Sequence, residues 1–259
     1  MSSLSLSHLQ MLGCNEAHLS PIVEQENIYV HGEILSSLRQ LTKDANAAGF
    51  DLKVASGFRS FERQLLIWNN KCSGNRAIMD EQGLALDIAG LSTKEKVYAI
   101  CRWSALPGAS RHHWGTDIDI YDAKVMSEDY QLQLQPSEYE ANGLFSPMME
   151  WLDVYLSLPS SPHFFKPYQL DKGGIAPEPW HLSYQPIADH YEQQLSLEVL
   201  HTLLSSISSA LVASDGLFDD VVIDDEGVLL SSVLGHYTLE DKVAVLEYLP
   251  DLYRRFVQR

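Results

Sequence analysis

The fold is decided by the stretch Ser110-Arg111-His112-His113-Trp114-Gly115-Thr116-Asp117-Ile118-Asp119, read together with Glu178-Pro179-Trp180-His181. Neutral imidazole and carboxylate are natural ligands of Zn²⁺, and a catalytic zinc usually has three protein ligands and one water. We predict that His112 and Asp119 supply two ligands from one local excursion of the chain, and that His181 supplies the third. Glu178 is not needed as a ligand, so it is free to act as a general base on metal-bound water.

Both stretches also predict local geometry. Gly115 permits a tight turn, and residues 116–121 alternate between polar and apolar like a half-buried strand. In a regular strand, Glu178 and His181 would face opposite ways, because side chains alternate between the two faces. Both reach one metal only if the chain bends at Pro179, a residue expected at strand starts or bulges. Trp180 would then pack on the opposite face.

The pattern of the two stretches resembles the signature of the VanY-type D-alanyl-D-alanine carboxypeptidases. These belong to the zinc metallopeptidases that also include lysostaphin and the Hedgehog amino-terminal domain. The family pattern is Ser-x-His-x-x-Gly-x-Ala-x-Asp, followed by Glu-x-x-His with Trp before the His. Asp117 stands where the family has Ala. Positions 117 and 119 share one face of a strand, so Asp117 lies near the metal or competes for it. The motif register favours Asp119 as the ligand, and Asp117→Ala, which restores the family residue, is expected to be tolerated.

A second segment resembles the same family, whose Ser-Gly-Tyr-Arg-Ser segment places an Arg and a Gln in the active-site cleft. Here it is Ser56-Gly57-Phe58-Arg59-Ser60-Phe61-x-x-Gln64. A carboxypeptidase must neutralise the free carboxylate of its substrate, and a planar guanidinium does so with two hydrogen bonds. We predict that Arg59 holds this carboxylate or the developing oxyanion; the alternative is a surface arginine in a solvated ion pair. The resemblance adds Gln64 and Ser110 as substrate-binding residues.

His113 competes with its neighbour within the metal stretch. Adjacent side chains diverge, and only one of the two histidines suits the motif register. We assign the metal to His112. For His113 we expect a contact just outside the metal ligands, a substrate contact, or simple exposure to solvent.

Composition excludes several classes of protein. The chain has 259 residues, long enough for one substantial core with a small appendage, and its formal charge of −17 argues against nucleic acid or an anionic membrane as a partner. Its three cysteines (Cys14, Cys72 and Cys101) form no CxxC motif, which favours free thiols and a reducing compartment. No targeting segment or run of about 18 apolar residues is found. We therefore expect a cytoplasmic monomer.

Outside the motifs, the periodicity of apolar residues predicts several helices. One spans residues 33–48, another follows Ser60 with Leu65, Leu66 and Trp68 on its buried side, and a third begins at the capping box Ser92–Glu95. The C-terminal part carries no chemical motif and is expected to be helical over 195–212 and over 239–257, with an interruption at Pro250. Its acidic run, Asp219-Asp220 and Asp224-Asp225-Glu226, lacks the spacing of a calcium loop and is predicted to be a solvated loop.

The resemblance implies an α+β fold in which a small antiparallel sheet forms the zinc cleft, packed with helices. We predict a zinc carboxypeptidase domain over residues 1–190 and a mainly helical C-terminal extension over 191–259. The implied activity is zinc-dependent hydrolysis of the C-terminal D-alanine of peptidoglycan-type peptides, with Glu178 as the base. Two alternatives stay open. One is an L,D-carboxypeptidase or endopeptidase on cell-wall peptides, and the other is a zinc-bearing binding module without catalysis. Glu178 argues against the second, because a purely structural site has no use for a free base.

Overall fold

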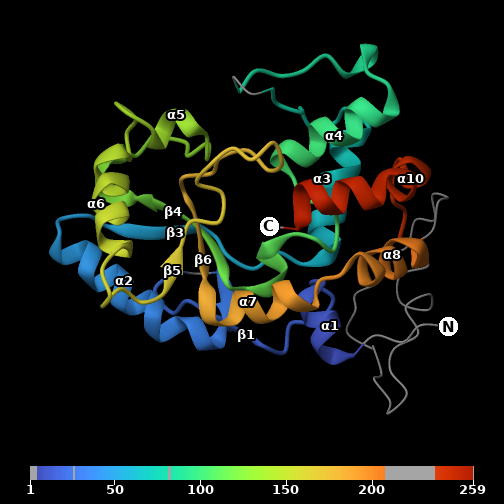
Figure 1. Cartoon of the computed structure of the whole chain (residues 1–259). Coiled ribbons are helices and arrows are strands. Elements are labelled where there is room, and N and C mark those ends of the chain that lie inside the picture. Colours follow the sequence, from blue (N-terminus) through green and yellow to red (C-terminus); the bar gives the residue numbers. More distant parts are fainter. Residues whose placement is uncertain (1–4, 26, 81–82, 208–236, 259) are drawn as a thin grey trace.

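The structure, a computed structural model, describes residues 5–25, 27–80, 83–207 and 237–258 (Figure 1). The helices are α1 (Leu6–Met11), α2 (Leu35–Ala47), α3 (Phe61–Cys72), α4 (Thr93–Trp103), α5 (Pro136–Tyr139), α6 (Ser146–Leu156), α7 (Gln185–Gln194), α8 (Leu197–Ser206) and α10 (Lys242–Leu252). The strands are β1 (Leu19–Pro21), β2 (Tyr29–His31), β3 (Leu52–Ser56), β4 (Asp117–Asp122), β5 (Phe164–Phe165) and β6 (His181–Tyr184). The mixture of helices with small antiparallel sheets is the α+β class expected from the sequence.

The central sheet has four antiparallel strands in the order β3-β4-β6-β5. Its register places Asp119 of β4 directly opposite His181 of β6, and Asp117 opposite Ser183. The ladder between β3 and β4 is irregular between Val54 and Ser56, at the point where β3 leads into the segment that carries Arg59. A separate two-stranded sheet pairs β1 with β2.

Strand β4 separates the core from the candidate site. Ile118 and Ile120 point into an apolar cluster that also contains Leu182 of β6 and is covered by α2 and α6. Asp117 and Asp119 lie on the opposite face, because side chains alternate along a strand. In Figure 1, α2 and α6 lie on one side of the sheet, and α3, α4, α8 and α10 gather beyond its other side. Asp117 and Asp119 on the polar face of β4 are both buried.

A second apolar cluster joins the C-terminal helices to the rest of the chain. It combines buried residues of α1, α3, α4, α7, α8 and α10. The Trp68 Nε1 of α3 donates to the carbonyl of Glu240 (3.2 Å), and Tyr98 Oη of α4 donates to Asp251 Oδ2 of α10 (2.5 Å). The described part of the C-terminal extension is thus bonded to α3 and α4, the helices next to the candidate site. The division of the chain at residue 190 stays a prediction.

Several local expectations can be compared with the structure. Ser60 and Ser92 cap α3 and α4 by accepting from backbone N–H groups, but Leu66, expected on the buried side of α3, is 49% exposed. Pro250 does not interrupt its helix: α10 continues through it to Leu252, since burial of Leu249 and Leu252 outweighs the backbone hydrogen bond that a proline cannot donate. Residues 208–212 of the predicted helix and the acidic run from Asp219 to Glu226 lie outside the described residues.

All three cysteines are free thiols, as expected. Within the ranges that the structure describes, no helix combines the length and the apolar character needed to span a bilayer.

Candidate metal site and cleft

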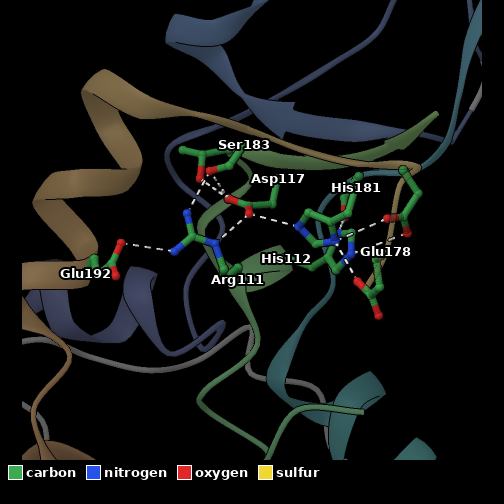
Figure 2. A network of polar contacts seen from close by, with 10 residues as sticks. Arg111, His112, Asp117, Glu178, His181, Ser183 and Glu192 are labelled. Atoms are coloured by element: carbon green, nitrogen blue, oxygen red, sulfur yellow. Dashed lines mark hydrogen bonds and ion pairs between the residues drawn. The ribbon is translucent and has the colours of Figure 1, made fainter. Parts of the chain in front are cut away.

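His112, Asp119 and His181 come together at the polar face of the sheet. Figure 2 shows the two histidines of this group close to each other. His112 lies in a short 3-10 turn, η3 (Arg111–Trp114), that leads directly into β4, and the other two residues are register partners on β4 and β6. One ligand atom from each residue can be chosen so that all three lie within 4.8 Å of one another. The structure therefore brings together the three residues that the sequence singled out.

Gly115 makes this close approach possible. It has a φ of +68°, in the left-handed region that favours glycine, and it ends the 3-10 turn just before β4. An added Cβ would lie 2.7 Å from the backbone nitrogen of His31 and 2.8 Å from Leu19 Cδ2. Any other residue here would strain the turn and displace His112 from the strand that carries Asp119.

Hydrogen bonds determine which nitrogen of each histidine faces the cluster. Nδ1 of His112 lies 2.9 Å from the carbonyl of Gly57, to which it donates, so Nε2 is left 3.3 Å from Asp119 Oδ2. His181 has the opposite arrangement: its Nε2 lies 2.9 Å from Asp117 Oδ1, and its Nδ1 lies 3.4 Å from Asp119 Oδ1 and 3.2 Å from Glu178 Oε2. Partners of this kind commonly fix the tautomer and the ring orientation of a metal-binding histidine.

The chemistry of the cluster fits a zinc ion. Asp119 Oδ1 and His181 Nδ1 are buried and have no aligned hydrogen-bond partner, although buried polar atoms are nearly always bonded. Both atoms belong to the cluster, and with His112 Nε2 they form the two-imidazole, one-carboxylate donor set that a catalytic zinc takes. A divalent cation among them would satisfy the two unpaired atoms at once.

Electrostatics keep Asp119 ionised. Burial alone would raise its pKa, but the neighbouring His112 and His181 outweigh burial and hold the pKa well below the usual value. Burial would also lower the pKa of His181, whereas the adjacent carboxylates of Asp117, Asp119 and Glu178 raise that pKa well above the usual value. In the absence of metal, the carboxylates thus attract a proton to His181. A bound cation would displace that proton, so metal affinity should weaken as the pH falls.

Asp117, the residue that departs from the family pattern, contacts the outer side of His181. Besides His181 Nε2, its carboxylate accepts from Arg111 Nε (2.7 Å), Thr116 Oγ1 (2.7 Å) and Ser183 Oγ (3.0 Å). Burial opposes ionisation, but the Arg111 guanidinium and these hydrogen bonds hold the pKa of Asp117 well below the usual value. Asp117 therefore lies near the cluster, with both carboxylate oxygens already bonded to other groups.

Arg111 extends this network away from the cluster (Figure 2). It donates to Ser183 Oγ (2.7 Å) and to Glu192 Oε2 on α7 (3.2 Å), and its guanidinium lies 4.4 Å from the ring centroid of Trp114. Sequence reasoning missed this role of Arg111. The only indication in the sequence was a basic residue inside the metal motif. Two partners of this residue, Ser183 and Glu192, come from distant segments.

Glu178 reaches the cluster through a turn. The backbone nitrogen of His181 donates to the Glu178 carbonyl (3.1 Å), and β6 begins only at His181. The chain thus bends at Pro179 and Trp180, which places Glu178 and His181 on the same side. Trp180 packs in the core, 5.2 Å from the ring of Tyr139. The Glu178 carboxylate, 15% exposed, therefore faces both the cluster and the cleft.

The cluster opens into a cleft of about 300 Å³, which Arg59, Ser110 and Glu178 also line. Arg59 Nη1 donates to Gln64 Oε1 (3.0 Å), and Gln64 Nε2 donates to the Ala105 carbonyl (2.7 Å). Among the described residues, no carboxylate lies within ion-pair distance of Arg59, so the alternative of a solvated ion pair does not apply. Gln64 is fully buried and holds Arg59 in place; its contact with substrate stays a prediction.

His113 is fully buried beneath this segment. Its Nδ1 lies 2.6 Å from the Arg59 carbonyl, and its Nε2 accepts from the backbone nitrogen of Gly108 (3.2 Å). Burial lowers its pKa to about 3, so the ring is neutral. Solvent exposure of His113, one of the three expectations, is wrong. The ring supports the backbone of Arg59 and does not line the cleft.

Comparison with known proteins identifies a family. The profile of VanY, described as D-alanyl-D-alanine carboxypeptidase, matches residues 27–187. An uncharacterised protein of Haemophilus influenzae is 42% identical over 100 residues, which cover 37% of this chain and 72% of that protein. A D-alanyl-D-alanine carboxypeptidase of Enterococcus faecalis is 28% identical over 167 residues, covering 62% of this chain and 51% of the relative.

Two solved structures are similar to this chain. One is a mutant of the vancomycin resistance D,D-pentapeptidase VanY in complex with Zn(II), with 26% identity and a TM-score of 0.45, covering 70% of this chain and 88% of that one. The other is the LD-carboxypeptidase LdcB, with 23% identity and a TM-score of 0.46, covering 71% of this chain and 77% of that one.

Proposed function

This chain belongs to the VanY family of D-alanyl-D-alanine carboxypeptidases, and we propose that it is a zinc-dependent carboxypeptidase that hydrolyses the C-terminal D-alanine of peptidoglycan-type peptides. His112, Asp119 and His181 would hold the metal. Glu178 would be the general base, Arg59 would act both in substrate binding and in catalysis, and Ser110 and Gln64 would belong to the substrate-binding cleft.

One observation carries the proposal. Two buried atoms, Asp119 Oδ1 and His181 Nδ1, lack hydrogen-bond partners inside a cluster of three potential metal ligands, and a carboxylate that is not part of the cluster lies 3.2 Å from one of them. A purely structural zinc site is closed by four protein ligands, whereas a catalytic site keeps one position for water. Three ligands with an adjacent base favour catalysis over a binding module.

Zinc bound at this cluster would lower the pKa of water toward about 7 and polarise the scissile carbonyl. Glu178 would accept the proton of the attacking water and return it to the amine that leaves. Asp117 and the Gly57 carbonyl would keep the two imidazoles aimed at the ligand position, through the hydrogen bonds that they make with the outer nitrogens.

Arg59 would supply positive charge to the bound substrate. It has no carboxylate partner of its own among the described residues, and Gln64 fixes its guanidinium. A fixed cation in a partly enclosed cleft stabilises a carboxylate or a developing oxyanion more strongly than a solvated one does. Ser110, which is 2% exposed and lines the same cleft, would hydrogen-bond the peptide.

The test combines metal analysis with turnover. The purified protein should contain about one zinc per chain and release D-alanine from a pentapeptide ending in D-Ala-D-Ala. A chelator should abolish release, and added zinc should restore it. Release from tetrapeptide stems instead would identify an L,D-carboxypeptidase, and cleavage of internal bonds would identify an endopeptidase. Stoichiometric zinc without hydrolysis of any of these peptides would contradict the enzyme assignment.

A further inference from the structure

Positive charge gathers on one wall of the cleft, in a protein that is otherwise strongly acidic. The chain has 18 lysines and arginines against 35 aspartates and glutamates. Nevertheless, Arg59, Lys71 and Arg76 all line the cleft that contains the metal cluster. Within the described ranges, no carboxylate lies within ion-pair distance of any of the three. None of the three cations is thus held in a salt bridge by an acidic group of the described protein.

Lys71 is the most unusual of the three. It lies near the end of α3 and is only 6% exposed, whereas Arg76 is exposed at the rim. Its ammonium makes one hydrogen bond, to Ser104 Oγ (2.7 Å), although an ammonium has three protons to donate. Lysines are almost never buried to this extent unless they are paired with an anion. The remaining protons of Lys71 therefore lack a partner that the described protein supplies.

The position of Lys71 relative to Arg59 indicates what this partner is. Gln64 joins Arg59 to the carbonyl of Ala105, and Lys71 bonds the side chain of the preceding residue, Ser104. The two cations are thus anchored to adjacent residues on the same wall. The backbone nitrogen of Arg59 donates to the carbonyl of the candidate ligand His112 (3.1 Å), and the carboxylates that act on its charge are Asp119 and Glu178, whereas the carboxylate that acts on Lys71 is Glu178. Arg59 is therefore the cation beside the metal cluster, and Lys71 lies further along the cleft.

We propose that Lys71 binds the free C-terminal carboxylate of the substrate peptide, on the side of Arg59 away from the metal cluster. The inference rests on the proposed function for the class of ligand, because a carboxypeptidase must recognise a chain end. It assigns the terminal carboxylate to Lys71 and leaves Arg59 closer to the scissile carbonyl. Lys71 takes no part in the chemical step. It binds the substrate and favours cleavage next to a free C-terminus over cleavage of internal peptide bonds.

The charge state of Lys71 provides a test that needs no substitution. Four groups from different elements interact with it electrostatically: Arg59, Arg76, Glu178 and Cys101. Burial, followed by the charges of Arg76 and Arg59, lowers its pKa to about 8. Lys71 is therefore charged at neutral pH and loses its proton as the pH rises through about 8. The preference for a free carboxylate should be fully present below that pH and should decline above it.

The experiment measures the affinity of the zinc-loaded protein for N-acetyl-D-alanine and for N-acetyl-D-alaninamide by calorimetry, from pH 6.5 to 9. The wild type should prefer the acid near neutral pH. Lys71→Met keeps the length of the side chain and removes the charge, so the preference should fall about tenfold to a hundredfold, the range for a hydrogen bond between charged groups. Arg63→Met is the matched control, because Arg63 is an exposed cation on the same helix; it should keep the wild-type preference.

Each outcome decides the proposal. An unchanged preference in Lys71→Met, or no preference in the wild type, would overturn it. If Lys71→Met does not fold, the pH series on the wild type decides: a constant preference up to pH 9 contradicts the proposal, and a decline above about 8 supports it.

Hydrolysis of D-Ala-D-Ala peptides is scored separately. If the wild type hydrolyses these peptides and Lys71→Met keeps the wild-type preference for the acid, only the role of Lys71 is refuted. A protein that binds the acid through Lys71 but hydrolyses nothing refutes only the proposed function.

Discussion

Asp117 and Asp119 are two residues apart on β4, on the same face and equally deep, but their surroundings differ. Asp117 is fully buried and its two oxygens accept four hydrogen bonds. Asp119 is 4% exposed and one of its oxygens has no partner. The neighbours of both carboxylates hold their pKa values below the usual value, so charge alone does not distinguish them.

The difference indicates a division of labour around His181. A carboxylate whose lone pairs are all engaged can orient a neighbour, whereas one with a free oxygen can bind a cation. Figure 2 shows Asp117 joined to Arg111 and Ser183 on one side of His181, and His112 and Glu178 on the other. The first group is complete within the protein, and the second still has unsatisfied atoms. Four substitutions test this comparison.

Removal of Asp119 should have the largest effect. Asp119→Ala deletes one of three ligands, so zinc content and hydrolysis should both fall to background, a larger loss than the roughly 10–100-fold expected when an outer partner is removed. Zinc is measured by elemental analysis after dialysis. His113→Ala is the control: it should lose thermal stability, because the ring is fully buried, but the folded fraction should keep its zinc. Full zinc content in Asp119→Ala would remove Asp119 from the ligand set.

Glu178→Gln should separate catalysis from metal binding. The amide preserves shape and cannot accept a proton, so kcat should fall by about two to four orders of magnitude, the range for general acid–base catalysis. KM should change much less, because ground-state contacts are retained. Zinc content and the unfolding curve should match the wild type. Loss of zinc in this variant would instead make Glu178 a ligand.

Asp117→Ala tests the other side of the comparison. The family pattern alone suggested that alanine would be tolerated here, but the structure reverses that expectation, because the substitution leaves buried Arg111 and His181 Nε2 without this partner. Zinc affinity should fall by about 10–100-fold. The free energy of unfolding should fall by about 3 kcal/mol or more, as when one member of a buried ion pair is removed. Chelator competition and urea denaturation measure the two effects, and wild-type values in both would show that Asp117 is dispensable.

The smallest effect is expected at the outer end of the network. Glu192 lies 3.2 Å from Arg111 and its side chain is 26% exposed, so solvent screens the pair. Glu192→Gln should change the free energy of unfolding by no more than about 1 kcal/mol, in line with partly exposed ion pairs, and zinc affinity should stay within about twofold. A loss as large as that of Asp117→Ala would mean that Glu192 is essential to the network.

The amino-acid sequence was sufficient to group the candidate ligands. His112, Gly115 and Asp119 are close in the chain, so a tight turn and a strand place them with little help from the rest of the fold. The spacing of Glu178 and His181 required a bend at Pro179, and the structure has a turn there. The caps of α3 and α4 were also predictable, because a cap depends on residues within one helical turn.

Tertiary structure decided the rest, because the deciding partners are distant in sequence. The nitrogen that His112 turns toward the cluster depends on Gly57, and that of His181 depends on Asp117. The oxygens of Asp117 are engaged because Arg111 and Ser183 donate hydrogen bonds to them in the folded sheet. The burial of His113 and of Lys71 followed from no local pattern. Sequence by itself determined which residue types meet at the cluster, since a motif specifies spacing. Only the packed fold determined which atoms of these residues remain without a hydrogen-bond partner. The reason is that the partners of a buried polar atom are its neighbours in space, which a local motif does not specify.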